Sequence, residues 1–433
     1  MAAVEGLTKI PELRRRILFT LGVLAVYRFG SHIPLPGIDP EQLKQFLGGK
    51  ESTLFSMFNM FTGRAMEHAS VFALGVMPYI SASIIFQLLT VVVPQLHAIN
   101  KEGDSGRKKI NQYTRYATVA IAIVQGTGLL TLVDATVAGR QLFNVIPYKV
   151  VTIIALTSGT MFLMWLGEQI SERGIGNGIS LIIYAGIGSG IPTAVSQTYR
   201  MVKDGQLTPL MLVILVAFMI LTVAVIIFLE TGQRRVPIHH AKRMVGKRLY
   251  GGQTQHLPLK INSSGVMPPI FASSLLTAPI TILSYAPASW TWAGSIRDAL
   301  QRGGVLYFLL YTSLIVFFAF FYTSVVFNTQ DMAENLKKSG AYVPGIRPGR
   351  NTQDYFDRVL MRLTVGGAIY LALVCLLPDF VSSKFKVSFY FGGTTLLILV
   401  GVALDTVSQV QTFLLTRDYE GFMKNAKLRG RRG

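Results

Sequence analysis

LMLVILVAFMILTVAVIIFL, residues 210–229, is a run of twenty residues without a charged side chain. A helix of about 20 apolar residues spans the hydrocarbon core of a bilayer and satisfies its own backbone hydrogen bonds there. The rest of the chain has the same character, because its 433 residues are 51% hydrophobic and only 15% charged. Its mean hydropathy is +0.45. These values exclude an ordinary soluble domain and predict an integral membrane protein.

Nine further segments are apolar enough to be predicted as membrane helices. Alternation of apolar and polar residues with a period of two, which is typical of transmembrane strands, is absent. We therefore expect an all-α membrane protein with ten transmembrane helices. The predicted spans are 17–33, 69–93, 116–133, 150–166, 179–195, 210–229, 265–283, 305–327, 363–377 and 389–407.

The distribution of Lys and Arg predicts the orientation of these helices. The N-terminus, the even-numbered loops and the C-terminal tail carry 29 of the 41 basic residues, whereas the odd-numbered loops carry 11. Arg28, inside the first span, is the remaining one, and we expect it to snorkel to the outer interface. Basic loops stay on the cytoplasmic side. Both termini are therefore predicted to be cytoplasmic.

Two long loops hold much of this positive charge. Residues 231–262 contain QRRVPIHHAKRMVGKR, and residues 328–360 contain NLKKSGAYVPGIRPGR. Connections between helices commonly run to about 2 to 8 residues, so both loops are unusually long. A topology signal and contact with lipid headgroups would explain their charge but not their length. We expect them to project from the membrane and to dock an acidic partner: lipid, nucleic acid or protein.

Patterns that indicate catalysis or metal binding are missing from the sequence. No Walker A signature, HExxH helix or nucleophile elbow is present. GIGNGIS at 174–180 lacks the preceding strand that a dinucleotide site needs, so we interpret it as a tight turn. His239 and His240 are adjacent, point apart on any regular element, and have no Cys or carboxylate nearby to complete a metal site. We expect neither an enzyme nor a cofactor.

The acidic residues of the predicted spans lie at their borders. Glu168, Glu230 and Asp405 each fall near the end of an apolar segment. A secondary transporter would need charged groups near the bilayer midplane, and a membrane-embedded enzyme would need a catalytic cluster near an interface. Neither is found in the sequence, although both classes remain as alternatives. If the protein moves a substrate, we expect a partner to supply the energy.

Six long and unusual motifs are spread along the chain. They are FALGVMPYISASIIFQLL (72–89), KEGDSGRKKINQYTRY (101–116), GTMFLMWLGEQISERGIGNGIS (159–180), HLPLKINSSGV (256–266), NLKKSGAYVPGIRPGRNT (335–352) and FYFGGTTLLILVGVALD (389–405). These motifs resemble those of the bacterial SecY family, the large subunit of the general protein-secretion channel. The resemblance extends from the first helix to the tail.

The resemblance implies a fold of two inverted five-helix halves around a central hourglass pore. A cytoplasmic N-terminus, residues 1–16, would precede an N-terminal half at 17–200. A C-terminal half at 201–411 would carry the two long cytoplasmic loops, and residues 412–433 would form a cytoplasmic tail. The implied function is a protein-conducting channel of the bacterial cytoplasmic membrane. It would move unfolded secretory chains across the membrane and release transmembrane segments sideways into lipid.

The resemblance also assigns positions to the pore and to its lateral opening. The waist of the pore would be a ring of six aliphatic side chains, which can close around any sequence and, when empty, resist water by dewetting. Val and Ile are ordinary in membrane helices, so only the resemblance singles them out. The ring positions are Val76, Ile80, Ile179, Ile183, Ile270 and Ile398. Ser81 and Gln125 match polar positions of the lateral gate, and Asn262 is a weaker candidate.

The partners implied by the resemblance fit the basic loops. The SecA ATPase and the ribosome would dock on them in turn, with Arg347 on a loop stiffened by Pro344 and Pro348. Arg234, Arg235 and Arg350 are further docking candidates. The small subunits SecE and SecG, signal sequences, unfolded secretory chains and membrane lipids are the other expected partners.

FSMFNMFTGRAMEHAS, residues 55–70, falls where the family carries its plug, a short helix that blocks the resting pore. The expected plug residues are Phe58, Phe61, Gly63, Arg64, Glu67 and His68. The alternative is an interfacial segment without a gating role. The family usually has glycine where this chain has Arg64, so this plug is unusually charged. We expect the three ionisable groups to lie in the wet outer funnel, and the alternative is that they pair with one another inside it.

Overall fold

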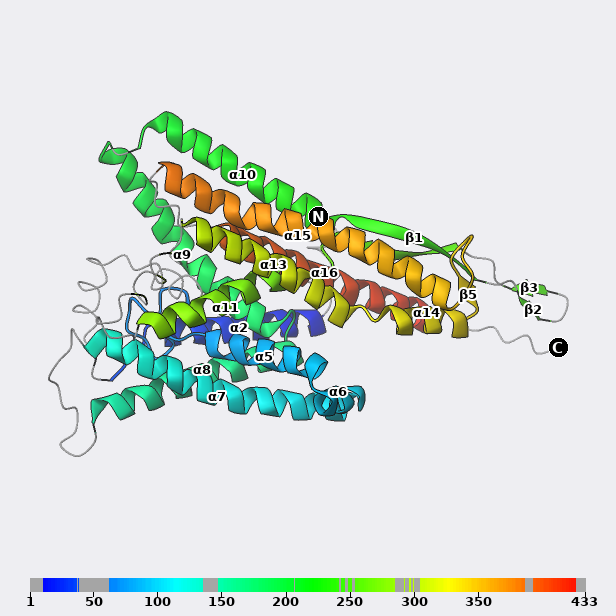
Figure 1. Cartoon of the computed structure of the whole chain (residues 1–433), viewed down its shortest axis with the longest axis horizontal. Helices are drawn as coiled ribbons and strands as arrows, with labels where there is room; N and C mark the ends of the chain where they lie inside the picture. The colour runs from blue at the N-terminus through cyan, green and yellow to red at the C-terminus, as the bar shows by residue number, and fades with distance from the viewer. Residues whose placement is uncertain are drawn as a thin grey trace. The chain divides into compact units, whose positions relative to one another are not determined.

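The computed structural model shows a helical protein in which every predicted membrane segment overlaps a helix. The chain divides into two compact units: unit 1 is residues 1–200 with 402–433, and unit 2 is residues 201–401. Figure 1 labels the elements of both units. The structure describes residues 11–36, 38, 62–134, 147–205, 207–240, 243–245, 248–250, 254–284, 292, 296, 299, 304–385 and 392–425.

Unit 1 is built from antiparallel helices that pack side by side. α5 lies against α7, α7 against α8, and α8 against α2 (Figure 1). Arg115 on α7 forms a bidentate ion pair with the Glu168 carboxylate on α8, with N···O distances of 3.1 and 2.7 Å. The acidic residue at the end of the fourth predicted span is thus neutralised by its neighbour. The helices are α2 (Pro11–Gly30), α5 (Met77–Val92), α6 (Pro94–Lys101), α7 (Asp104–Asp134), α8 (Tyr148–Arg173) and α9 (Gly178–Lys203).

The second predicted span begins later than its hydropathy indicates. Residues 63–76 form a succession of turns, and the helix starts only at Met77, with Pro78 in its first turn. Proline favours this place because its missing N–H would be unpaired there anyway. At the other end, α5 and α6 meet at a bend of 99°. Apolar composition alone therefore placed the helix start eight residues too early, at Ala69.

Unit 2 contains the helices with the most exposed apolar surface. On α10 (Pro209–Thr231), Phe228 is 76% exposed, and the buried side chains in the helix are Thr222 and Ile226. A helix that is apolar on all sides and mostly exposed is expected to face lipid. α11 (Met267–Ser284) packs on α13 (Val305–Val326), which packs on α15 (Arg350–Phe385) (Figure 1). α16 (Gly393–Asn425) begins in unit 2.

The two long basic loops are joined in one small sheet, which the sequence did not predict. β1 (Gln233–His240) pairs antiparallel with β4 (Thr254–Lys260), placing Val236 opposite Leu257. β5 (Ala341–Tyr342), from the second loop, pairs with the far end of β1. The strand order is therefore β4-β1-β5. β2 (Arg243–Val245) and β3 (Arg248–Tyr250) form a separate ladder.

A hydrophobic core fixes this sheet to the beginning of α15. Its buried members are Val236, Leu259, Val343, Phe356, Val359 and Leu360. The short helix α14 (Thr329–Lys338), capped by the Asn328 side chain, also packs on α15. The loops thus form a folded platform with its own core rather than two independent flexible connections.

Length and hydropathy identify six helical stretches in the described residues that can cross a membrane. They are α8, α9, α10, α13 with α14, α15 and α16, and the bent pair α5–α6 makes a seventh. α2, α7 and α11 overlap the other three predicted spans. The fold is therefore a mostly helical membrane fold.

Truncating Phe356 tests whether the platform depends on its core. Phe356 is fully buried, so Phe356→Ala should cost about 3 to 5 kcal/mol of local stability. We expect trypsin to cut rapidly at Arg234 and Arg235 in the variant. Met361, on the same helix, is 62% exposed, and Met361→Ala is the control. Equal cleavage of both variants would show that the core does not hold the sheet.

Candidate functional site

In unit 1, two predicted ring positions lie where the turns meet α5. Val76 is the residue before the helix, with φ −95° and ψ 4°, and its carbonyl accepts the Ile80 amide at 3.0 Å. Both side chains are buried. Val76 is thus an N-cap rather than a helical residue. The hydrogen bond between the two residues preserves their spacing of one helical turn.

The other two ring positions of unit 1 begin α9. Asn177 caps this helix, because its side-chain oxygen accepts the Ser180 amide at 3.3 Å. Ile179 and Ile183 follow on one face, one turn apart. Ile183 is buried and Ile179 is half-buried. In unit 2, the predicted ring residues Ile270 on α11 and Ile398 on α16 are both buried.

The described part of the plug segment, from Thr62 onward, packs closely on α9. Gly63 has φ +64°, a conformation that glycine adopts without strain. A Cβ at Gly63 would lie 2.6 Å from the Cα of Gly186, so only glycine fits this contact. Gly186 is three residues beyond Ile183, or about 4.5 Å along the helix axis. Phe58 and Phe61 lie outside the described residues.

Two side chains donate hydrogen bonds to the backbone carbonyls at the tip of this segment. The Tyr27 hydroxyl donates to Thr62 O, and Arg28 Nη1 donates to Gly63 O, each at 3.3 Å. Ser189 Oγ also lies 3.3 Å from Gly63 O, but its single hydrogen points to the nearer Gly186 O, at 2.7 Å. Tyr27 and Arg28 come from α2, and Ser189 comes from α9. The Arg28 guanidinium, which we expected at the outer interface, thus has a partner in the plug segment. A charged residue inside an apolar span needs a partner, and that signal could have pointed to this role.

The charged residues of the segment pair with each other. Arg64 Nε and Nη2 both lie 2.7 Å from Glu67 Oε2, and the two side chains are 20% and 25% exposed. The structure thus shows mutual pairing rather than separate solvation for these two. Arg64 has φ +65°, which is strained for a residue other than glycine. The His68 ring stacks on His32, with centroids 5.1 Å apart.

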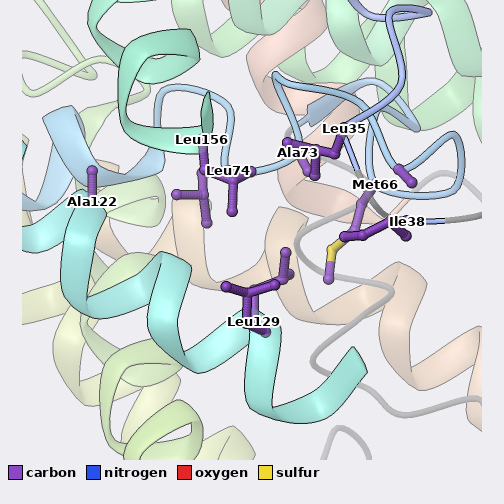
Figure 2. Close-up of a cluster of buried hydrophobic side chains, with 10 residues drawn as sticks. Leu35, Ile38, Met66, Ala73, Leu74, Ala122, Leu129 and Leu156 are labelled. Carbon is purple, nitrogen blue, oxygen red and sulfur yellow. The ribbon is translucent and has the colours of Figure 1, made fainter. Parts of the chain in front are cut away.

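The rear of the segment is anchored in a hydrophobic core of unit 1. Figure 2 shows Met66 and Ala73 together with Leu35, Leu74 and Leu129. Two backbone hydrogen bonds also join it to the chain after α2: Leu35 N to Ala69 O at 2.6 Å, and Val71 N to Ile33 O at 3.0 Å. The tip is therefore held by a few polar contacts and the rear by a core.

The predicted gate residues occupy different environments. Ser81 is half-buried on α5, and Gln125 is half-buried on the adjacent α7. Within the described residues, the buried Oε1 of Gln125 has no hydrogen-bond partner. Asn262 is fully engaged: its Nδ2 donates to Glu230 Oε1 at 2.6 Å and to Gly265 O at 3.0 Å, and its Oδ1 accepts from Ser264. Asn262 thus ties the end of α10 to the start of α11.

The predicted docking arginines are exposed on the loop platform. Arg234 and Arg235 project from the start of β1, opposite Leu259 and Pro258 of β4. Arg347 lies between the β5 strand and α15, and its carbonyl accepts the Thr352 hydroxyl at 2.9 Å. Arg350 is the first residue of α15. Each arginine thus extends from backbone that is fixed by a strand, a hydrogen bond or a helix.

No group of three or more His, Cys, Asp or Glu residues that could bind a metal occurs in the part of the chain that the structure describes. His239 instead stacks on Tyr342, with ring centroids 6.0 Å apart. The contact joins β1 to β5. This histidine therefore has a packing role in the platform.

Comparison with known proteins gives a consistent result. The SecY family model matches residues 70–407. The protein translocase subunit SecY of Escherichia coli strain K12 is 51% identical over 424 residues, which cover 97% of this chain and 96% of the relative.

Solved structures show the same fold at low sequence identity. One described as the structure of a protein conducting channel has a TM-score of 0.67 and 18% identity, and the match covers 94% of this chain and 96% of that one. Sec61 in the canine ribosome–channel complex from the endoplasmic reticulum has a TM-score of 0.61 and 17% identity, with the same coverage. The extent of the sequence match, over nearly the full length of both chains, shows that this protein belongs to the SecY family.

Proposed function

We propose that unfolded secretory polypeptides pass through a pore closed by the six aliphatic ring residues and by the plug segment. SecY proteins are protein-conducting channels of the bacterial inner membrane, and the family forms a pore rather than an enzyme. One observation carries the proposal for this chain. Gly63 of the plug segment contacts α9 at Gly186, within one turn of the ring residue Ile183.

The chemistry of the ring suits a polypeptide substrate. An extended chain presents every type of side chain, so polar or charged groups lining the pore would bind some sequences too tightly. Aliphatic side chains make only non-directional contacts, and an empty apolar constriction excludes water and ions by dewetting. The ring would therefore seal around a moving chain without holding it.

Displacement of the plug tip would open this path. The tip is held by two side-chain hydrogen bonds of 3.3 Å, which is long for an N–H···O or O–H···O bond. Thr62 Oγ1 is buried with no partner among the described residues, which costs roughly 1 to 3 kcal/mol. A weakly held tip on a firmly anchored rear would let the segment swing aside and return.

The proposed topology has ten transmembrane helices in two inverted halves, with both termini in the cytoplasm. It is supported by the helices at all ten predicted segments and by the excess of basic residues in the even-numbered loops. In this arrangement the platform formed by the long loops lies in the cytoplasm. An odd number of helices in each half gives the halves opposite orientations.

The lateral gate would lie beside α5 and α7, where Ser81 and Gln125 are found. The unpartnered Oε1 of Gln125 supports this proposal, because a gate that exchanges partners leaves a polar group unsatisfied in one state. Interhelical hydrogen bonds in membranes average about 0.6 kcal/mol, enough to bias such a gate without locking it. Asn262 already makes three hydrogen bonds, so it is better explained as a structural link between the end of α10 and the start of α11.

Partners would supply the driving energy. We assign Arg234, Arg235, Arg347 and Arg350 to docking of the SecA ATPase and the ribosome, and we expect SecE and SecG as accompanying subunits. The folded platform supports the docking role because it presents these exposed arginines from ordered backbone. The occurrence of Sec61 in a ribosome–channel complex supports the ribosome as a partner.

Crosslinking of a stalled secretory chain tests the channel directly. The single native cysteine, Cys375, would first be replaced by alanine. Cysteines would then replace Ile80 or Ile183, and a partner cysteine would be placed on the stalled chain. We expect disulfides at both ring positions. Ile214, 60% exposed on α10, is the control position at which none should form. A chain that reacts equally at Ile214, or at neither ring position, would contradict the pore assignment.

A single methyl group at Gly63 should weaken the closed state. Gly63→Ala places a Cβ against the Gly186 backbone and strains a positive φ, which costs about 1 to 2 kcal/mol. The closed-to-open ratio should fall about tenfold, and conductance of resting channels in planar bilayers should rise. Gly188→Ala, on α9 two residues from Gly186 but with open space for a Cβ, is the control. Unchanged conductance in Gly63→Ala would contradict the assignment of this segment as the plug that closes the resting pore.

Reversing the charge of Arg347 should separate docking from folding. We expect Arg347→Glu to insert normally but to impair SecA-driven export into inverted vesicles, since an acidic partner surface would be repelled. Lys338→Glu makes the same charge change at an exposed position of the same loop and should have little effect. Normal export by Arg347→Glu would refute the docking assignment.

A further inference from the structure

The turn between α8 and α9 is held by acceptors from three different helices. The Ile175 amide donates to Thr20 Oγ1 of α2 at 3.1 Å, and the Gly178 amide donates to Ser171 Oγ of α8 at 2.9 Å. Between them, the Gly176 amide donates to Gln409 Oε1 of α16 at 3.0 Å. The GIGNG sequence is therefore more than a tight turn, because each of these backbone amides is hydrogen-bonded to a side chain of a different helix.

The packing of this turn leaves little room for movement. Gly176 has φ +92°, and a Cβ there would lie 2.7 Å from the Leu181 side chain. A Cβ at Gly174 would lie 2.5 Å from Thr20 Oγ1, and one at Gly178 would collide with the Gly167 carbonyl. The turn thus fits closely between its neighbours, so a shift of any of these helices would be transmitted to it.

The ring residues of α9 start directly after this turn. Ile179 is the second residue of the helix, and its Cγ1 packs so closely on α8 that a Cβ at Gly167 would lie 2.8 Å from it. Ile183 follows one turn later. A rigid helix transmits a displacement of its first turn to both residues. The position of the turn therefore sets the position of both side chains.

α16 reaches the turn near its middle. Thr406 lies close to Gly176, and Gln409, one turn further on, is exposed apart from its hydrogen bond to the turn. A second contact fixes the same part of α16, because the Arg16 guanidinium of α2 lies 5.3 Å from the centre of the Phe413 ring. Beyond this point α16 continues to Asn425, into the C-terminal tail.

We propose that Gln409 is a positioning residue for the pore ring: through the amide of Gly176 it couples the middle of α16 to Ile179 and Ile183. The inference rests on the proposed function, because it takes these two residues as part of the ring. A partner that binds the tail and moves the end of α16 would thereby move one side of the ring. Gln409 touches no substrate and acts only through the turn.

The exposure of Gln409 separates this role from a contribution to stability. If its acceptor is lost, the Gly176 amide, in a partly exposed turn, can bond to water instead. Folding should therefore be little affected. The position of the turn, in contrast, loses one of its three constraints.

Site-specific crosslinking of a stalled secretory chain tests the proposal in the intact translocase. Single cysteines at 76, 80, 179 and 183, without Cys375, would report on the α5 and α9 sides of the ring separately. We expect Gln409→Leu to lower crosslinking at 179 and 183 about fivefold, the size expected for the loss of one hydrogen bond, and to leave 76 and 80 unchanged. Gln409→Glu keeps an acceptor oxygen and should restore the parent pattern.

Two further variants control the experiment. Gln411→Leu removes an exposed glutamine two residues further along α16 and should have no effect. Thr20→Val removes the acceptor of the Ile175 amide, on α2, and should also lower crosslinking at 179 and 183 but not at 76 and 80. This variant keeps the test possible if Gln409→Leu does not accumulate. The melting temperature of purified Gln409→Leu, Gln409→Glu and Gln411→Leu should stay at the parent value.

The outcomes distinguish this inference from the proposed function. If the parent protein shows no crosslinks at any of the four positions, the ring assignment fails and the inference fails with it. If the parent crosslinks and Gln409→Leu keeps its full yield at 179 and 183, only the inference is overturned. An equal loss at all four positions, or a lowered melting temperature, would show general loosening and would also overturn it.

Discussion

Every backbone N–H and C=O group inside a membrane must find a partner in the protein, because hydrocarbon offers none. The long helices meet this requirement internally, so their side chains are free to face lipid, as on α10. Two irregular segments of unit 1 do so only in part, namely the turns at 62–76 and the turn at 174–177. Side chains of neighbouring helices provide partners for some of their remaining carbonyls and amides. These are also the segments next to the proposed ring residues, so the functional region is where the requirement is met by tertiary contacts.

The two irregular segments are fastened with different strength. The two side-chain bonds to the plug tip are each 3.3 Å long, whereas the three side-chain bonds to the α8–α9 turn measure 2.9 to 3.1 Å. Shorter bonds near the usual N–H···O distance are the stronger ones. The geometry therefore makes the tip of the proposed plug easier to release than the turn and the start of α9. A channel that opens and recloses needs a seal that moves more readily than its frame.

Hydropathy predicted the helices well because the bilayer requirement acts on each segment separately. It failed where tertiary contacts decide the structure. The start of α5 was misplaced because residues 69–76 are apolar but buried as turns. The sheet was missed because its alternating stretch is short and is interrupted by Pro237 and Pro258. The binding of Arg28 to Gly63 depends on residues 35 positions apart, which no local pattern records. The ring residues could be named only by resemblance, since Val and Ile are common in any membrane helix.

The pairing of Arg64 with Glu67 has an electrical consequence. A plug that moves in and out of a pore crosses part of the membrane potential, which acts on each elementary charge with about 2.3 kcal/mol per 100 mV. A lone arginine at position 64 would make opening depend on voltage, and an energised membrane would bias the plug towards one position. Because the two side chains lie 2.7 Å apart and move together, their charges cancel in the field. If the segment is displaced as proposed, this pair would leave its seat without electrical work, and the membrane potential would act on the translocating chain rather than on the plug.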